Sequence, residues 1–216
     1  MAKATANLAA LRTLAILQTE SRAPTEAERA VLGHWSGWGA IPEVFDQDNQ
    51  RWAPARSELR ELLDERAWAQ AARTTINAHY TSATVVQALW RAVVGLGFTG
   101  GRVLEPGCGS GNFVGLAPVP IQAIGVELDP TTAAVARALY PSADIRTESF
   151  ADTRLPADHF GLAIGNVPFG KIALHDPTHN PRRLSIHNHF IVKSLHLVRP
   201  GWTGGGRHVT FHPGRP

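Results

Sequence analysis

The stretch Val103-Leu-Glu-Pro-Gly-Cys-Gly-Ser-Gly-Asn-Phe113 decides the fold of this chain. It begins inside a short apolar run at 102–105, which is typical of a buried strand. Glycines alternate in the turn that follows, at Gly107, Gly109 and Gly111. Glycine adopts positive φ readily and lets the backbone approach a ligand closely. A dinucleotide-binding turn has the spacing G-x-G-x-x-G, but Asn112 stands where its third glycine would be, so the turn predicts a different ligand.

Short apolar strands alternate with helices in this part of the chain. Strands are expected at 102–105, 123–128, from 145 onward and at 162–165, and helices at 85–94, 130–139 and 185–197. Such alternation is typical of βαβ units, in which helices cover both faces of a parallel sheet. We therefore expect an α/β fold with a Rossmann-like sheet, and a ligand site at the carboxyl ends of its strands.

The first 75 residues predict helices instead of strands. Apolar residues recur at helical spacing over 1–20. Thr25 and Glu28 have the spacing of a capping box at the start of a second helix. Ser57 is expected to cap a third helix that runs to about Ala72. The stretch 35–42, rich in Gly and Trp, predicts a loop.

The composition limits the class of protein and its compartment. Hydrophobic residues make up 44% of the 216 residues, which is enough for one α/β core and a helical segment. The single cysteine, Cys108, excludes an intramolecular disulfide and suits a reducing cytoplasm. No apolar run approaches the ~20 residues that a membrane span needs, and no signal peptide is recognisable. We expect a cytoplasmic protein with no membrane partner.

Positive charge gathers toward the end of the chain. The net charge is +3, and residues 172–216 hold six Lys and Arg against one acidic residue. Such an excess can attract phosphate. A solvated, irregular basic tail is an equally good interpretation.

The glycine turn resembles the first motif of class I S-adenosylmethionine-dependent methyltransferases, E/D-x-x-x-G-x-G. The resemblance implies S-adenosyl-L-methionine as the cofactor. Its methionine part would pack on the three glycines, and its amino group would lie near Glu105. Asn112, at the end of the turn, is expected to border the same site.

The next strand ends in Gly125-Val-Glu-Leu-Asp129, where the resemblance implies recognition of the adenosine part of the cofactor. Glu127 is expected to accept both ribose hydroxyls, and Leu128 to pack on the adenine ring. Alternatively, both acids open the next helix, where negative charge favours the helix dipole. We prefer the helix-start interpretation for Asp129. For Glu127 we prefer the ribose interpretation, because it follows a matched glycine turn.

Asn166-Val-Pro-Phe169 follows the strand at 162–165 and resembles the [DNS]-P-P-[YF] motif of amino-methyltransferases. The resemblance implies that the Asn166 amide oxygen and the Val167 carbonyl accept the hydrogens of a target amine. Pro168 would stiffen the turn, and Phe169 would offer a ring face to a flipped-out base. Val167 replaces the usual proline, but this position acts through its carbonyl. Alternatively, Asn166 forms the turn in a left-handed conformation.

Two further segments resemble cofactor contacts of adenine methyltransferases. Tyr80 and Thr81 match part of an F/Y-T-P motif that closes over the methionine end of the cofactor, although Ser82 replaces its proline. A buried tyrosine followed by a helix cap is the alternative. Asp152, in Ser149-Phe-Ala-Asp152, is expected to contact the adenine amine of the cofactor, with an ordinary loop residue as the alternative.

The order of these segments resembles N6-adenine DNA methyltransferases fused to helicases, which phages, plasmids and bacterial mobile elements carry. The resemblance spans about residues 8–201 and is most specific in Gly37-Trp-Gly-Ala-Ile-Pro42 and Ser185-Ile-His-Asn-His-Phe190. It implies methyl transfer to adenine N6, with DNA as the substrate and a helicase domain or partner chain. A metal site is not expected, because His187 and His189 lie two residues apart on a helix and have no cysteine partner.

We expect a helical segment at 1–75, a partial methyltransferase domain at 76–201 and an irregular tail at 202–216. A complete sheet of this family has about seven strands and about four are readable, so we expect an incomplete sheet with an open edge and a truncated C-terminus. Three functions remain open. They are DNA adenine methylation, methylation of protein glutamine or RNA amino groups, and cofactor binding by a catalytically inactive fragment.

Overall fold

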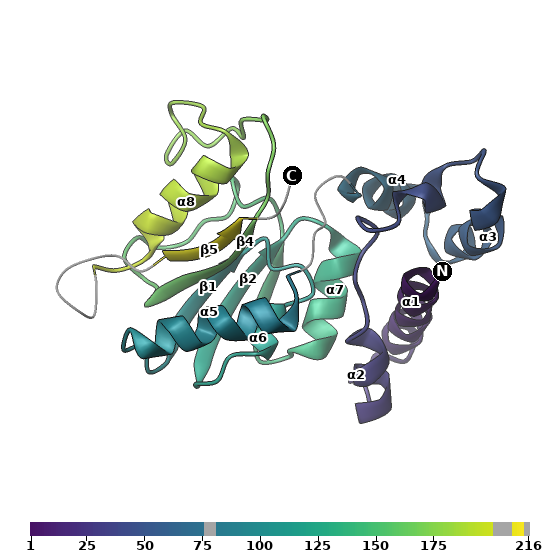
Figure 1. The fold of residues 1–216 in the computed structure, drawn as a ribbon, viewed down its shortest axis with the longest axis horizontal. Helices are drawn as coiled ribbons and strands as arrows, with labels where there is room; N and C mark the ends of the chain where they lie inside the picture. The colour runs from purple at the N-terminus through teal and green to yellow at the C-terminus, as the bar shows by residue number, and fades with distance from the viewer. Residues whose placement is uncertain (76–80, 201–208, 214–216) are drawn as a thin grey trace.

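The computed structural model describes residues 1–75 and 81–200, and the backbone of residues 209–213. Its centre is a parallel sheet with the strand order β3-β2-β1-β4-β5 (Figure 1). The strands are β1 (Gly101–Pro106), β2 (Ile121–Glu127), β3 (Asp144–Thr147), β4 (Leu162–Val167) and β5 (Val209–Pro213). The chain runs outward from β1 to β3 and then returns to β4 on the other side of β1. The strand order therefore reverses between β1 and β4, and parallel sheets bind ligands at the carboxyl ends of the strands that flank such a reversal.

Helices cover both faces of the sheet, as the alternating pattern predicts. The helices of this unit are α5 (Ala83–Gly95), α6 (Asn112–Gly115), α7 (Pro130–Leu139) and α8 (Ile186–Leu197). On one face, Trp90 of α5 packs with Val103 and Ile164 of the sheet. On the other face, Phe190 of α8 packs in a cluster with Leu104 and other buried residues of the sheet. Successive residues of a strand therefore contribute to two separate cores, one on each face of the sheet. This arrangement confirms the predicted α/β fold.

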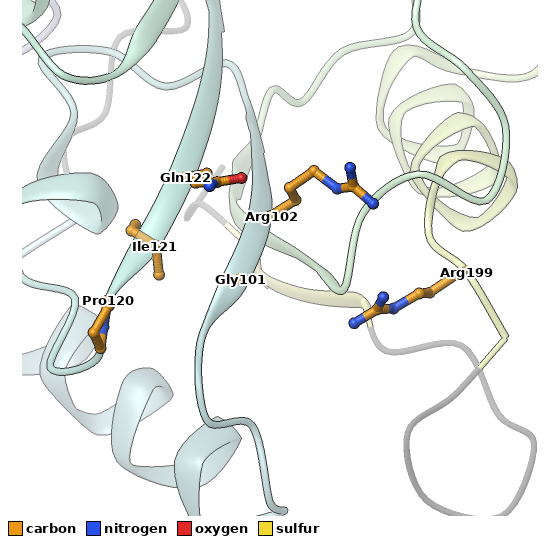
Figure 2. Close-up of a pocket in the computed structure, with 6 residues that line it drawn as sticks. All are labelled: Gly101, Arg102, Pro120, Ile121, Gln122 and Arg199. Carbon is orange, nitrogen blue, oxygen red and sulfur yellow. The ribbon is translucent and has the colours of Figure 1, made fainter.

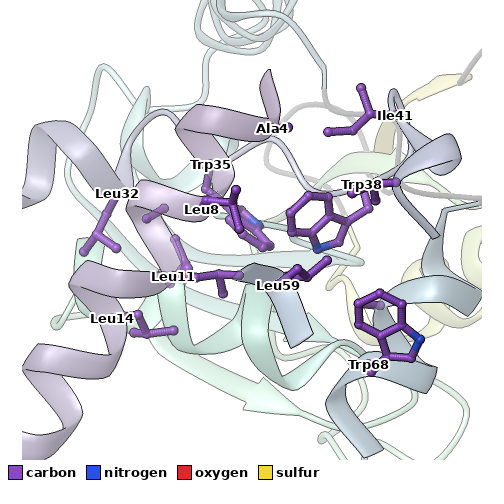
Figure 3. Packing of buried hydrophobic residues seen from close by; sticks show 14 of the residues in the cluster. Ala4, Leu8, Leu11, Leu14, Leu32, Trp35, Trp38, Ile41, Leu59 and Trp68 are labelled. Atoms are coloured by element: carbon purple, nitrogen blue, oxygen red, sulfur yellow. The ribbon is translucent and has the colours of Figure 1, made fainter. Parts of the chain in front are cut away.

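The N-terminal part of the chain is helical, as predicted. It contains α1 (Ala2–Glu20), α2 (Glu26–Leu32), α3 (Ala53–Leu62) and α4 (Glu65–Thr74), with short 3-10 turns at Pro42–Phe45 and Gln50–Trp52. Thr25 and Glu28 form the expected capping box. Leu8, Leu11 and Leu14 of α1 face a core that also holds Trp35, Trp38 and Trp68 (Figure 3). Edge-to-face ring contacts run from Trp35 to Trp38, then to Phe45 and Trp68.

This helical core continues into the sheet unit through α7. Val135 of α7 belongs to the same buried cluster as the tryptophans. Trp35 Nε1 also donates a hydrogen bond of 3.2 Å to Thr132 Oγ1. Asn7, which is fully buried in α1, donates from Nδ2 to the carbonyl of Gly37 and accepts from the amide of Ser36. The loop at 35–42 is therefore fixed between α1 and the start of α7.

Two predictions from the sequence need correction. Ser57 does not cap a helix, because α3 begins at Ala53 and Ser57 lies inside it. The helical run breaks at Leu63, and Asp64 caps α4 by accepting from the amide of Ala67. The predicted single helix is therefore two helices, and the second is capped by an aspartate that the sequence analysis did not identify.

The predicted irregular tail contains a strand. Val209–Pro213 forms β5, which pairs with β4 in parallel register, with Ala163 opposite Val209 and Val167 opposite Pro213. A bare β4 edge would leave a row of unpaired backbone groups, so even a short run of β-formers gains by pairing there. The residues described thus form five strands where about four were predicted.

Candidate active site

The glycine turn links β1 to α6 at the carboxyl edge of the sheet. All three glycines have positive φ, of 70° at Gly107, 55° at Gly109 and 84° at Gly111. The amides of Gly107 and Cys108 both donate to the carbonyl of Val126 in β2. The turn is therefore held against the end of β2 in a backbone conformation that residues with a side chain rarely adopt.

Glu127 joins the end of β2 to this turn. One carboxylate oxygen accepts from the amide of Gly109 at 2.9 Å, and the other from the amide of Asp129 at 2.8 Å. Burial raises the pKa of Glu127 to about 7, although hydrogen bonds from the Asp129 and Gly109 amides oppose the shift. Each carboxylate oxygen keeps a further lone pair, so Glu127 can still accept two hydroxyl groups.

The neighbours of Glu127 take different positions. Asp129 is buried at the start of α7 and accepts from the amide of Thr132 at 2.9 Å, which confirms the helix-start interpretation. Leu128 is 59% exposed. An exposed apolar side chain beside the partly buried carboxylate of Glu127 suits the face of an adenine ring next to its ribose.

Glu105 lies at the end of β1 with only 2% of its surface exposed. Burial raises its pKa well above the usual range, and backbone hydrogen bonds from Val114 and Phe113 oppose this shift. Among the described residues its Oε2 has no hydrogen-bond partner. A buried polar atom without a partner is costly, so a donor from a ligand, such as an ammonium group, would satisfy it.

Asn112 connects the glycine turn to the segment before α5. Its Nδ2 donates to the carbonyl of Thr81 at 3.1 Å. The buried Thr81 hydroxyl also has no partner within the described part of the chain. Thr81 therefore lies beside the glycine turn. Tyr80, the other residue of this motif, lies outside the described residues.

The Asn166–Phe169 segment meets the glycine turn at the edge of the sheet. A methyl group built on Gly107 would lie 3.6 Å from Phe190 Cε1, 3.7 Å from the Asn166 carbonyl oxygen and 4.0 Å from Pro168 Cδ. Asn166 and the buried Val167 are the last two residues of β4. The structure thus brings together three segments that lie far apart in the sequence.

Phe169 stacks on His187, with ring centroids 5.4 Å apart and an angle of 19° between the planes. His187 is a partly buried residue near the start of α8. The Ile-His-Asn-His-Phe stretch is one of the most specific parts of the resemblance, but no role was predicted for it. In the structure the His187 ring stacks on Phe169, and the Phe190 ring lies next to Gly107. The order aromatic–x–x–aromatic at the start of a helix was the available signal.

Asp152 is the least integrated of the predicted site residues. It is exposed in the loop after β3, where its amide donates to the carbonyl of Ser149. Lys193 of α8 donates to the carbonyls of Phe150 and Ala151 and so holds the residues that precede it. The loop is fixed at the carboxyl edge of the sheet, but Asp152 itself faces solvent.

A surface hollow lies at the opposite edge of the sheet (Figure 2). It is lined by Gly101, Arg102, Pro120, Ile121, Gln122 and Arg199. Gly101 and Ile121 are the first residues of β1 and β2, so this hollow is at the amino ends of the strands. It is separate from the glycine turn and from Asn166.

Two negative findings concern the described residues alone. Residues 1–75 and 81–200 contain no group of three or more His, Cys, Asp or Glu that could hold a metal ion. His187 and His189 point to different partners, Phe169 and Asp176. In the same part of the chain, no helix has the length and apolar character to cross a membrane.

Comparison with known proteins gives one sequence relative and several related structures. No protein-family model matches the chain. Over 134 residues, or 59% of this chain, the sequence is 25% identical to "Defense against restriction protein B" of Escherichia phage P1. The matched stretch spans 6% of the length of the phage protein.

A solved class I S-adenosylmethionine-dependent methyltransferase from Listeria monocytogenes is similar with a TM-score of 0.50 and 17% identity, over 93% of this chain and 71% of that one. A methyltransferase subunit of a type I restriction-modification system from Streptococcus thermophilus has a TM-score of 0.47 and 16% identity, over 72% of this chain and 42% of that one.

The chain therefore has the fold of S-adenosylmethionine-dependent methyltransferases, with a Rossmann-like parallel sheet. S-adenosyl-L-methionine is the cofactor expected of this fold. The residues at the carboxyl edge fit it. They supply a turn of left-handed glycines, a buried Glu105 oxygen that has no hydrogen-bond partner among the described residues, and a carboxylate beside an exposed Leu128.

Proposed function

We propose that this protein transfers the methyl group of S-adenosyl-L-methionine to the exocyclic N6 amine of adenine in DNA. The observation that carries the proposal is the close approach of Asn166 and Pro168 to Gly107 of the glycine turn. An amine bound at Asn166 would thus lie next to the methionine end of a cofactor held by the turn.

The cofactor would bind along the carboxyl edge of β1 and β2. Glu105 and Thr81 would accept from its amino group, and Gly107, Gly109 and Gly111 would pack on its methionine part. Glu127 would accept the two ribose hydroxyls and Leu128 would cover the adenine. Tyr80, Asn112 and Asp152 complete the proposed contacts. When bound, the cofactor supplies a methyl group on a positively charged sulfur.

The chain's own residues would prepare the acceptor. The lone pair of the adenine amine is delocalised into the ring, so the amine is a poor nucleophile. If Asn166 Oδ1 and the Val167 carbonyl each accept one amine hydrogen, the nitrogen moves toward tetrahedral geometry and its lone pair faces the methyl group. On transfer, the nitrogen would gain the methyl group and one amine hydrogen would leave as a proton to solvent. Phe169, backed by His187, would stack on the base.

The sequence relative supports a DNA context, because it is named for defence against restriction. The same proposal includes a helicase domain or partner chain, a cytoplasmic location, and a domain boundary between residues 75 and 76. The helical segment would act as one body with the methyltransferase unit, since their cores are continuous through α7.

The direct test offers labelled S-adenosyl-L-methionine with duplex DNA, the same sequence as RNA, and a glutamine-containing peptide. N6-methyladenine in the DNA after digestion is the expected product. Label found in the peptide alone, or in the RNA alone, would show that this molecule and not DNA is the substrate. Cofactor binding with no transfer to any of the three would show an inactive cofactor-binding protein.

Glu127→Ala should weaken cofactor binding by roughly 10- to 150-fold, because hydrogen bonds to a charged acceptor contribute about 1.5–3 kcal/mol. Isothermal calorimetry with S-adenosylhomocysteine measures this. Asp129→Ala is the matched control. It removes the cap of α7 and should lower stability by about 1 kcal/mol with little loss of affinity. A larger loss of affinity for Asp129→Ala than for Glu127→Ala would show that Asp129, and not Glu127, recognises the ribose.

Cofactor affinity should rise with pH across neutrality. The pKa of about 7 leaves about a tenth of Glu127 ionised at pH 6 and about nine tenths at pH 8. Ribose hydroxyls donate to the ionised form, so bound cofactor lowers this pKa and the Kd should be about tenfold larger at pH 6 than at pH 8. Glu127→Gln should flatten the profile. If Glu105→Gln flattens it and Glu127→Gln does not, the titrating group is Glu105.

A further inference from the structure

The segment from Lys171 to Arg183 follows Phe169 directly and leads into α8. Its basic side chains are exposed at Lys171, Arg182 and Arg183, and His175 is exposed with them. The single acidic residue of this segment, Asp176, is only 1% exposed. The segment therefore presents positive charge to solvent and keeps its negative charge inside.

Asp176 anchors the segment to α8. Its Oδ2 accepts from Lys193 Nζ at 3.0 Å and lies 3.0 Å from His189 Nε2, and both side chains are fully buried. Its Oδ1 accepts from the amides of Thr178 and His179. Burial alone would raise the pKa of Asp176. The hydrogen bonds from His179, His189 and Lys193 outweigh burial and hold the pKa below its usual range. Lys193 thus offsets the buried carboxylate.

Asn180 fixes the second half of the segment. Its Nδ2 donates to the carbonyls of Leu174 and Leu184, and its Oδ1 accepts from the amide of Leu184 at 2.7 Å. Asn180-Pro-Arg-Arg183 closes as a turn, with the Arg183 amide donating to the Asn180 carbonyl at 3.0 Å. Proline presets φ at the second position of such a turn. Arg182 therefore lies within a hydrogen-bonded turn, and Arg183 closes it.

The segment is also fastened beside the proposed base site. The amide of Ile186, at the start of α8, donates to the carbonyl of Ile172 at 2.8 Å. His187, one residue further, stacks on Phe169. The exposed basic residues therefore belong to a segment that is held at both ends next to Phe169 and the start of α8.

We infer that residues 171–183 form a preorganised binding site for the phosphodiester backbone of the nucleic-acid strand that carries the target base. This inference rests on the proposed function, because the target base is taken to bind at Phe169. Arg182 and Arg183 would donate to phosphate oxygens, whose geometry matches the planar guanidinium group. Lys171 would add a positive point charge. Such contacts position the strand without reading its sequence. The anchors at Asp176 and Asn180 reduce the ordering cost of binding.

The test measures the salt dependence of binding to a short labelled duplex by fluorescence anisotropy. The Arg182→Ala/Arg183→Ala variant should bind more weakly. Its slope of log affinity against log salt should fall by up to about 1.8, since each phosphate contact contributes roughly 0.9. Arg66→Ala/Arg91→Ala is the matched control, because it removes the same charge from exposed positions on α4 and α5. The control should keep the parental slope.

Three results would overturn the inference. They are a parental slope in the Arg182→Ala/Arg183→Ala variant, an equal loss of slope in the control, and a parent that binds neither the DNA duplex nor its RNA counterpart. The DNA and RNA arms identify the source of the phosphates, and binding of an acidic peptide in their place counts against a nucleic-acid site. Asn180→Ala tests preorganisation. It should lower affinity at unchanged slope, and parental affinity would overturn a preformed turn.

Cofactor calorimetry on the same variants separates this inference from the proposed function. All of them should bind S-adenosylhomocysteine as the parent does, because the altered residues do not touch the glycine turn. If the parent fails to bind cofactor or transfer methyl groups while the salt slope still falls in the arginine variant, the proposed function fails and the phosphate site stands.

Discussion

Gly109→Val is expected to reduce cofactor binding below detection while the protein still folds. Gly109 has a φ of 55° and its amide donates to Glu127. A β-branched residue in this conformation costs about 1–2 kcal/mol, which is small against the roughly 5–15 kcal/mol stability of a typical domain. The loss of binding would arise because the branched side chain occupies the space in which the turn must meet the cofactor. Calorimetry with S-adenosylhomocysteine and thermal unfolding by circular dichroism measure the two effects.

Gly95→Val is the matched control for this substitution. Gly95 is exposed at the end of α5, and a Cβ atom built there meets no atom within 4 Å. This variant should fold and bind cofactor as the parent does. Unchanged cofactor affinity in Gly109→Val would remove the glycine turn from the proposed cofactor site.

The local features of the fold could be predicted from the sequence because they depend on neighbouring residues. Strand 102–105 and the glycine turn are contiguous, and α7 begins where Asp129 and Pro130 provide a cap and a fixed φ. Parallel strands bring their carboxyl ends to one edge, so the meeting of Glu127, Gly107 and Asn166 followed from topology alone.

The remaining features depend on contacts between distant residues, which a sequence pattern does not encode. β5 was expected to be irregular because Val209-Thr-Phe211 is short and flanked by Gly and Pro, and only the open edge of β4 selects it as a strand. Asp176 and Lys193 are 17 residues apart, yet they form one buried pair. A lone lysine within the apolar run of α8 was the available signal.

Asn166 is the residue whose replacement should separate chemistry from binding. It lies at the end of β4, where its main-chain carbonyl oxygen is 3.7 Å from a Cβ atom built on Gly107. In the proposed function its side chain contacts the target amine and not the cofactor. The alternative role as a left-handed turn-former is excluded. Positive φ among the described non-glycine residues occurs only at Ser21, Asp158 and Arg183. Asn166→Ala is therefore compatible with the backbone of the strand.

Asn166→Ala should leave the Kd for S-adenosylhomocysteine nearly unchanged and lower the single-turnover rate of methyl transfer by about 10²-fold or more. This is the scale for losing one well-placed hydrogen bond that forms fully only in the transition state. Asn166→Asp keeps an acceptor oxygen at the same distance from the backbone, so it should recover part of the rate that alanine loses. A rate equal to the parental one in Asn166→Ala would rule out the role assigned to the amide oxygen. Equal losses in both variants together with weakened cofactor binding would show that Asn166 supports the glycine turn and does not orient the amine.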